Sequence, residues 1–277
     1  MAPIPPYSPQ LQTQPPSTSF TTITFPAPHT LLVTLNRPKQ LNCINSAGHR
    51  ELDEIWTWFD NEPELRVGIV TGAGRAFCAG ADLKVLCTDL PDFEHPNTEW
   101  NSSNASARAR PSMPPSGFGG LSRRRGKKPV IAAVNGIAHG GGCEIIVNTD
   151  IVLASPAAKF ALPEVKRGVA AIAGALPRLI RTLGRQRAME MALTGREVGA
   201  EEARAWGLVN QVAGKDGEGV VELAVKWAGV IAGNSPDSVI VSKAGVELGW
   251  EGMGVEEASG QVVREGGCGR GWKGGRI

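Results

Sequence analysis

The feature of this sequence that most constrains its fold is a pair of short, wholly apolar runs. Residues 67–70 read Val-Gly-Ile-Val and residues 130–134 read Val-Ile-Ala-Ala-Val, which predicts two short buried strands. Two further strands are predicted at residues 20–25 and 31–35, joined by a Pro-Ala-Pro turn at residues 26–28. The chain is therefore expected to build a β-sheet into its interior.

An amphipathic helix is predicted between these strands. Leu52, Ile55, Trp56 and Phe59 recur at i, i+3, i+4 and i+7, with Ser46 as the predicted N-cap. A succession of strand, helix and strand implies a parallel α/β arrangement with right-handed crossovers.

The pattern along the chain suggests three parts. Residues 1–18 are rich in Pro, Ser, Thr and Gln and lack the apolar block of a signal peptide, so a disordered arm is expected. Residues 19–199 are expected to form the core. Residues 200–277 are expected to be helical, with a Gly-rich end that makes a poor helix.

Helical patterns in this last part cover residues 200–206, 220–232 and 235–248. Within the core, residues 87–128 are polar and aperiodic, and a segment of that length without structure is usually functional or disordered. Its far end, residues 114–125, is compatible with a short helix.

Composition excludes several classes of function. A formal net charge of +2 gives no reason to expect nucleic acid or a membrane surface, and no apolar run approaches the ~20 residues that span a bilayer. The five cysteines are scattered and never spaced CxxC, which argues against a disulfide framework or a zinc site. The histidines stand alone, so no metal site is predicted. An intracellular protein is expected, with cytoplasm, peroxisome and mitochondrion left open.

Two Gly-rich turns are candidates for chemistry. Residues 77–82 read Phe-Cys-Ala-Gly-Ala-Asp and residues 139–144 read His-Gly-Gly-Gly-Cys-Glu, and each follows a predicted strand. If a helix begins at the triple glycine, its free N–H groups and dipole can stabilise negative charge on a carbonyl oxygen. Glycines that merely permit tight helix–strand packing are an equally good interpretation. A third turn at residues 72–77 begins like a dinucleotide fingerprint but has Phe in its sixth position and no helical pattern after it.

Two carboxylates accompany these turns. Glu144 follows the triple glycine directly, and Glu164 follows Pro163 at the start of another predicted helix. A carboxylate is favoured at a helix N-terminus in any protein. The sharper hypothesis is a pair of general acid/base groups that share one pocket, and sequence spacing does not decide between the two.

At these residues the chain resembles the enoyl-CoA hydratase/isomerase (crotonase) family. Residues 77–84 are similar to its first signature, and residues 128–136 followed by Gly140-Gly141-Gly142-Cys143-Glu144 are similar to its second. The resemblance extends over about residues 30–242. It implies an α/β fold made of a spiral of ββα units, followed by a helical C-terminal region that oligomerises as a homotrimer or hexamer.

The resemblance also implies roles for residues. The N–H groups of Ala81 and Gly141 would form the oxyanion hole, and Glu144 and Glu164 would be the two catalytic carboxylates. The remaining expected site residues would line the binding site of coenzyme A: Ala79, Asp82, Leu83 and Gly140. Coenzyme A would be part of the substrate, and no separate cofactor is expected.

The resemblance favours one reaction over several alternatives. Isomerases of the family often keep only the second carboxylate, so having both favours hydration of a 2-enoyl-CoA to a 3-hydroxyacyl-CoA. The alternatives are an enoyl-CoA isomerase, a hydrolase or dehydratase of a specialised acyl-CoA, and a non-enzymatic acyl-CoA- or RNA-binding relative. The basic run at residues 123–128 fits a solvated loop or a contact to CoA phosphates equally well.

Three departures from the family pattern bear on this interpretation. Ala171 and Ile172 stand where hydratases usually have Pro-Gly, which affects water placement and acyl preference. His139 replaces an apolar residue and is a candidate third polar group near the thioester. The Gly-rich C-terminus is several residues short, which affects contacts to CoA.

Overall fold

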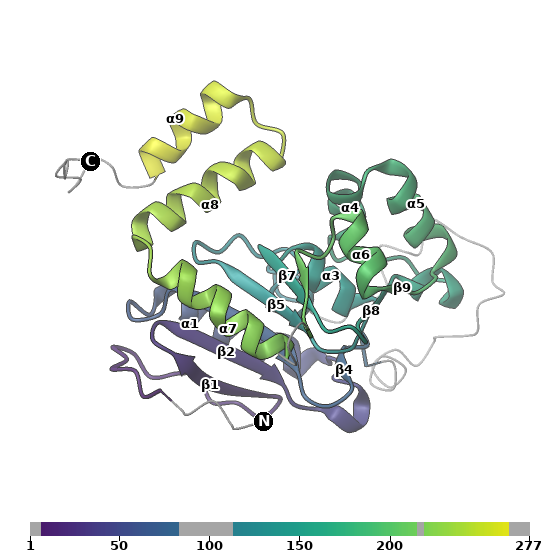
Figure 1. Cartoon of the computed structure of the whole chain (residues 1–277), viewed down its shortest axis with the longest axis horizontal. Coiled ribbons are helices and arrows are strands. Elements are labelled where there is room, and N and C mark those ends of the chain that lie inside the picture. The colour runs from purple at the N-terminus through teal and green to yellow at the C-terminus, as the bar shows by residue number, and fades with distance from the viewer. Residues whose placement is uncertain (1–6, 83–112, 215–218, 266–277) are drawn as a thin grey trace.

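Two β-sheets lie at the centre of the molecule (Figure 1). The computed structural model describes residues 7–82, 113–214 and 219–265. The larger sheet has the strand order β1-β2-β3-β5-β7-β10 and the smaller one β4-β6-β8-β9. The strands of the larger sheet are β1 (Thr21–Ala27), β2 (Thr30–Leu35), β3 (Val67–Gly72), β5 (Val130–Val134), β7 (Ile151–Ala154) and β10 (Gln211–Val212). Those of the smaller sheet are β4 (Ala76–Cys78), β6 (Ile137–His139), β8 (Lys159–Ala161) and β9 (Val198–Gly199).

The chain passes from the larger sheet to the smaller one three times in the same sense. Strand β3 leads into β4, β5 into β6, and β7 into β8. Within each sheet these strands pair in parallel, whereas β1 pairs antiparallel with β2 and β8 with β9. This repeated passage is the ββα spiral that the sequence predicted, so the expected fold class is confirmed.

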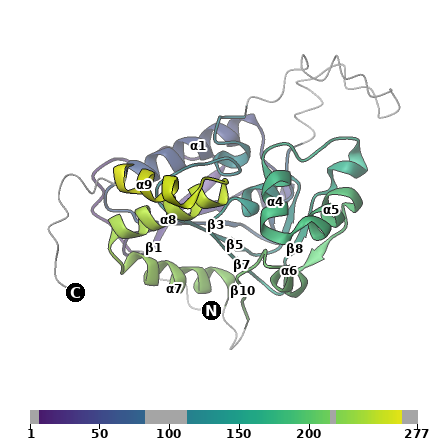
Figure 2. The ribbon, with the colours of Figure 1, turned by 90° about the horizontal axis from the view of Figure 1, so that it is seen from above.

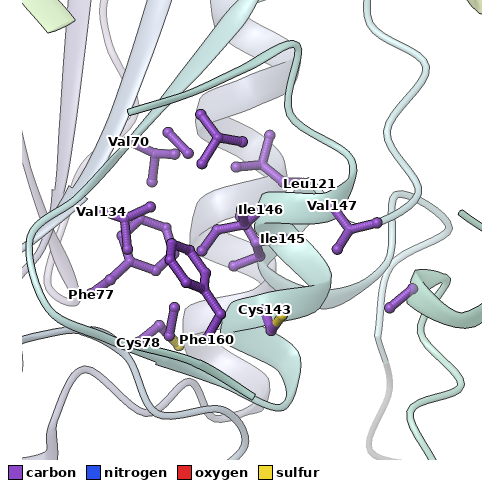
Figure 3. Packing of buried hydrophobic residues seen from close by; sticks show 14 of the residues in the cluster. Val70, Phe77, Cys78, Leu121, Val134, Cys143, Ile145, Ile146, Val147 and Phe160 are labelled. Carbon is purple, nitrogen blue, oxygen red and sulfur yellow. The ribbon is translucent and has the colours of Figure 1, made fainter. Parts of the chain in front are cut away.

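The apolar runs are explained by burial on both faces of the larger sheet. Alternate residues of a strand point to opposite faces. Val67 and Ile69 of β3 pack with helix α7 (Val220–Ala232) on one face, whereas Val70 belongs to the main core on the other. Figure 3 shows Val70 and Val134 in that main core, together with Ile145 and Ile146 of helix α3 (Gly141–Val147).

The remaining helices surround the sheets. They are α1 (Ser46–Asn61), α4 (Ala175–Leu183), α5 (Arg185–Thr194), α6 (Ala200–Trp206), α8 (Pro236–Trp250) and α9 (Val255–Glu265), with short 3-10 helices η1 (Pro38–Gln40), η2 (Phe118–Gly120) and η3 (Pro163–Arg167). Helices α8 and α9 extend from the end of α7 on one side of the molecule, and α4, α5 and α6 gather on the other (Figures 1 and 2). No helix in the described residues is long and apolar enough to cross a membrane.

Three local predictions need correction. The N-cap of α1 is Asn45, whose side chain accepts a hydrogen bond from the N–H of Gly48, and not Ser46. Residues 114–125 form only the short helix η2, because Gly117, Gly119 and Gly120 all have positive φ. The helix that carries Glu164 is the five-residue 3-10 helix η3, which begins at Pro163 and is capped by Gly168 in the left-handed conformation.

The N-terminal segment contacts the core where the structure describes it, at residues 7–18. The N–H of Tyr7 donates to the carbonyl of Phe25 at 2.9 Å. The N–H groups of Gln12 and Thr13 donate to the carboxylate of Glu62, which is fully buried. This carboxylate therefore gives a Pro- and Thr-rich segment a fixed place on the core. Residues 1–6 lie outside the described residues.

Candidate active site

The two Gly-rich turns meet at one edge of the smaller sheet. Strands β4 and β6 are parallel neighbours, so the segments that follow them leave the sheet side by side. A Cβ atom placed on Gly80 would lie 3.1 Å from the carbonyl oxygen of His139 and 3.4 Å from the nitrogen of Gly141. Turns that are about sixty residues apart in the sequence are thus in direct contact.

Each turn has a backbone N–H that is left without a partner in its own element. Ala81 forms a parallel bridge with Ile44, in which Ile44 donates to the carbonyl of Gly80 at 2.9 Å and Asp82 donates to the carbonyl of Ile44 at 3.0 Å. In that pairing the N–H of Ala81 points away from Ile44. Gly141 is the first residue of α3, where a backbone N–H has no partner within the helix.

Packing alone accounts for all three glycines of the second turn. Gly140 has φ of +53°, and a Cβ atom there would lie 3.0 Å from Oε1 of Glu164. At Gly141 a Cβ atom would lie 2.5 Å from the Phe118 ring, and at Gly142 it would lie 2.1 Å from the carbonyl oxygen of Cys78. The tight-packing interpretation of these glycines is therefore correct, and it is compatible with an oxyanion site at the same place.

Glu144 is a buried carboxyl group on the first turn of α3. Burial raises its pKa, and the N–H groups of Ala175, Ala173 and Gly174 and the charge of Arg123 offset this only in part. The N–H of Ala175 lies 3.4 Å from Oε1 of Glu144. The loop before α4 thus supplies three successive amides to one carboxyl group.

Glu164 approaches Glu144 from the first turn of η3. Burial, followed by the negative charge of Glu144, raises its pKa to about 7, although its own backbone N–H lowers it. Its Oε2 atom is buried and has no hydrogen-bond partner among the described residues. Both carboxylates also raise the pKa of the buried Cys143 thiol, after the larger effect of burial. The structure therefore brings the two predicted glutamates together as an interacting pair.

The residues expected to line the CoA site are only partly described. The N–H of Ala79 donates to the carbonyl of Leu41 at 3.0 Å, and Asp82 forms an ion pair with Arg37 at 2.9 Å. Gly140, in the second turn, lies next to the carboxyl group of Glu164. Leu83 lies outside the described residues, as does most of the aperiodic segment at residues 87–128.

A cavity of about 930 Å³ lies beside this site. It is lined by α1, by residues 115–126, by residues 171–178 and by Arg181 and Glu251, whereas Glu144 and Glu164 are not part of its lining. The loop at residues 171–174 forms the wall between the cavity and Glu144. Among the described residues, no group of three or more His, Cys, Asp or Glu side chains is arranged to hold a metal ion.

The basic run at residues 123–128 has protein partners in the structure. Arg123 donates to the carbonyls of Ala173 at 3.1 Å and Ile172 at 2.5 Å, and Arg124 pairs with Asp60 at 2.6 Å. Arg125 is 79% exposed. Neither Arg123 nor Phe118 was predicted as a site residue, because no sequence signal links either to partners 50 and 23 residues away.

His139 does not join the carboxyl pair directly. Its Nε2 atom lies 3.3 Å from Oε1 of Glu197, and burial lowers its pKa more than Glu197 raises it. The ring thus lies near Glu197 on the segment before β9, but its Nε2 atom has no hydrogen-bond partner among the described residues.

Comparison with known proteins agrees with the fold. The profile of the enoyl-CoA hydratase/isomerase family matches residues 29–110 and 120–259. The chain is 54% identical to a mevalonyl-coenzyme A hydratase of Beauveria bassiana, over 86% of this chain and 82% of that protein. It is 51% identical to a mevalonyl-coenzyme A hydratase of Aspergillus fumigatus, over 87% and 83%.

Solved structures extend this agreement. An enoyl-CoA hydratase of Mycobacterium tuberculosis aligns with a TM-score of 0.74 and 32% identity, over 88% of each chain. An enoyl-CoA hydratase of Bacillus anthracis aligns with a TM-score of 0.75 and 32% identity, over 91% of each chain. The resemblance seen in the sequence is confirmed, and the chain belongs to the enoyl-CoA hydratase/isomerase family.

Proposed function

We propose that this protein is a CoA-thioester hydratase whose acyl group is branched and hydroxylated, in the class of mevalonyl-CoA. The observation that carries the hydratase assignment is the interacting pair of Glu144 and Glu164, both with raised pKa, beside the N–H groups of Ala81 and Gly141. The acyl class rests on the two relatives above 50% identity, both named mevalonyl-coenzyme A hydratases.

The geometry supports hydration without a metal. One carboxylate takes a proton from water while the water oxygen forms a bond to C3 of the enoyl thioester. The C2–C3 π electrons move towards the carbonyl, and negative charge develops on the thioester oxygen. The N–H groups of Ala81 and Gly141 would stabilise this charge, and one such donor is typically worth ~2.7–4 kcal/mol. The other carboxyl group then donates a proton to C2, and reversal of these steps is dehydration.

The proposed binding site for the substrate is made by the first Gly-rich turn and by Gly140 of the second. We propose that Ala79, Asp82, Leu83 and Gly140 line the CoA site, with CoA as part of the substrate. We also propose that the protein acts as a homotrimer or hexamer, as the family resemblance implied, and sedimentation at several concentrations tests this.

A panel of CoA thioesters tests the acyl class. Loss of enoyl absorbance would be followed with straight-chain 2-enoyl-CoAs and with the 3-methyl-5-hydroxy-2-enoyl-CoA that dehydration of mevalonyl-CoA produces, and each product would be identified. We expect kcat/KM to be highest for the branched, hydroxylated thioester. A preference of tenfold or more for straight chains would contradict the acyl class and leave the hydratase assignment intact.

The pair itself is tested by Glu144→Gln and Glu164→Gln. Each should lower kcat on the best substrate by ~10²-fold or more, because general acid/base groups contribute ~10²–10⁴-fold. Glu190→Gln, on the exposed side of α5, is the control. If Glu144→Gln keeps near wild-type turnover, an isomerase with Glu164 as its one acid/base group replaces the hydratase assignment.

A further inference from the structure

The loop that faces Glu144 has open space behind it. Residues 171–174 belong to the connection between η3 and α4, and the N–H groups of Ala173, Gly174 and Ala175, the first residue of α4, act on the Glu144 carboxyl group. On their other side, Ala171, Ile172 and Gly174 line the cavity of about 930 Å³. Ala171 and Ala173 are buried in the main core, and other groups in addition set the direction of the three amides.

Those groups are side chains that donate hydrogen bonds to the carbonyl oxygens of Ile172, Ala173 and Gly174, which belong to the same peptide units as the three N–H groups. The carbonyl of Ile172 accepts from Nη2 of Arg123 at 2.5 Å. The carbonyl of Ala173 accepts from Nε of Arg123 at 3.1 Å and from Oγ of Ser122 at 2.8 Å. The carbonyl of Gly174 accepts from Nη1 of Arg178 at 3.3 Å, and Arg178 also donates to the carbonyl of Ser122 at 3.0 Å.

Because the peptide bond is planar, these hydrogen bonds to the carbonyls also set the direction of the neighbouring N–H groups. In a trans peptide the C=O of one residue and the N–H of the next lie in one plane and point in opposite directions. The carbonyl of Ile172 therefore fixes the N–H of Ala173, and the carbonyl of Ala173 fixes the N–H of Gly174. Each donor that pulls a carbonyl away from Glu144 turns the paired amide towards it.

We propose that Arg123 is a positioning residue of the active site, which holds two of the three amides that face Glu144 by binding the carbonyls on the opposite side of the loop. Ser122 and Arg178 complete the arrangement, and Arg178 holds the third amide. Arg123 acts through the loop and does not touch the reacting atoms.

The charged groups around Glu144 make this role measurable. Glu164 faces it from η3, Arg123 faces it from residues 116–124, and the Cys143 thiol adjoins it on α3. Replacement of Arg123 removes a positive charge and two oriented amides, all of which stabilise the ionised form of Glu144. The negative charge of Glu164 remains, so ionisation of Glu144 becomes less favourable. The acid limb of the pH profile of kcat/KM should then move to higher pH.

Arg123→Met and Arg123→Lys test the proposal, with Arg125→Gln as the matched control. Arg125 belongs to the same basic run and lines the same cavity, but it is 79% exposed and its contact with Glu251 is 4.0 Å long. Arg123→Met should lower kcat about 10- to 100-fold with little change in KM, since a small misplacement can cost that much. Arg123→Lys keeps the charge but not the fork of donors, and should fall between Arg123→Met and wild type.

Amide hydrogen exchange of residues 172–176 gives a readout that does not depend on activity. Exchange should be faster in both Arg123 variants and unchanged in Arg125→Gln. The kinetic predictions for the Arg123 variants rest on the proposed function. If wild-type protein turned over none of the thioesters, the proposed function would be rejected, and the exchange measurements would still test the role of Arg123 in the loop. The proposal would be overturned if Arg123→Lys showed unchanged exchange and an unchanged acid limb, whatever its thermal stability. The same result in a folded Arg123→Met protein would also overturn it.

Discussion

At the scale of residues, the protonation of two carboxyl groups decides the chemistry. Hydration needs one carboxylate to accept a proton from water and one carboxylic acid to give a proton to C2, so the active pair carries one proton. Dehydration begins with the proton on the other member of the pair, and the total is again one. The apparent pKa values therefore belong to Glu144 and Glu164 jointly.

This argument predicts the pH dependence of the reaction. The pKa of Glu164 is about 7, so kcat/KM should fall as pH rises above about 7 and the pair loses its proton. It should also fall at low pH, where both groups are protonated. Because both directions need one proton on the pair, hydration and dehydration should give the same profile. Rates measured in both directions from pH 5 to 9 check this, and a flat profile across that range would contradict it.

The same pKa predicts an effect on stability. Between about pH 4.5, the ordinary value for Glu164, and about pH 7, the folded protein holds a proton that the unfolded chain has lost. The free energy of unfolding must therefore decrease as pH rises through that range. Glu164→Gln removes this cost and should be more stable than wild type at pH 8, on the order of 1–2 kcal/mol after allowance for partial exposure, but not at pH 4.5. Denaturant unfolding at the two pH values measures the difference, and an equal effect at both would contradict it.

At the scale of elements, the start of α3 is constrained by η2. Gly141 touches the Phe118 ring so closely that Gly141→Ala should overpack the site and lower stability by ~1–3 kcal/mol. Phe118→Leu in the same chain should relieve the contact, so the double variant should be more stable than the sum of the single effects predicts. A double-mutant cycle of unfolding free energies measures this coupling. Additive effects would contradict this coupling, because they would mean that the Phe118 ring is not the source of the cost of Gly141→Ala.

That coupling also changes how the oxyanion site must be tested. A proline at Gly141 would remove the amide and collide with Phe118, so a loss of rate alone would not identify the missing amide. Alanine at Gly141 adds the same collision but keeps the N–H. Turnover of the Gly141→Ala and Phe118→Leu double variant therefore measures the effect of a Cβ atom beside the amide once the collision with the ring is relieved. The double variant should recover stability, and a kcat that stays low would mean that the Cβ atom displaces the thioester from the amide.

Local sequence patterns predicted most of the elements and failed at identifiable points. Strands β3 and β5 and helices α6 and α7 lie where the patterns put them, because burial on a fixed face leaves a clear period in the sequence. The short helix considered for residues 114–125 covers only η2, because glycines in the left-handed conformation limit it. Glu144 and Glu164 were found through their turns. Arg123 was not, because its role depends on a loop that the fold alone brings beside it.

At the scale of the whole molecule, the core and the C-terminal helices are held by different forces. Helix α7 buries Val220, Leu223 and Ala224 against the larger sheet. None of the residues of α8, all of which the structure describes, is buried. The chain after α7 therefore depends on polar contacts to stay on the core.

Those contacts lie at two points along α8. Nζ of Lys243 lies 2.5 Å from Oδ1 of Asp150, whose other oxygen accepts from the N–H of Val130 at 2.8 Å. At the end of α8, the ring of Trp250 lies under the guanidinium groups of Arg178 and Arg181, at 5.7 and 5.5 Å. Glu251 follows and lies 3.5 Å from Arg181.

We therefore expect α8 and α9 to open more readily than the rest of the chain, and Lys243→Met to promote that opening. The variant leaves Asp150 without its cation, yet Asp150 still caps β5, so the core should keep its stability. Amide exchange in α8 and α9 should accelerate severalfold while exchange in α7 is unchanged, because the apolar contacts of α7 are untouched. A salt concentration of about 1 M should accelerate exchange in wild-type α8 in the same sense, since it screens the exposed Glu251 contacts. Both measurements must be made on the same oligomeric form. Equal protection of α7 and α8 in the variant would mean that apolar contacts hold the C-terminal helices instead.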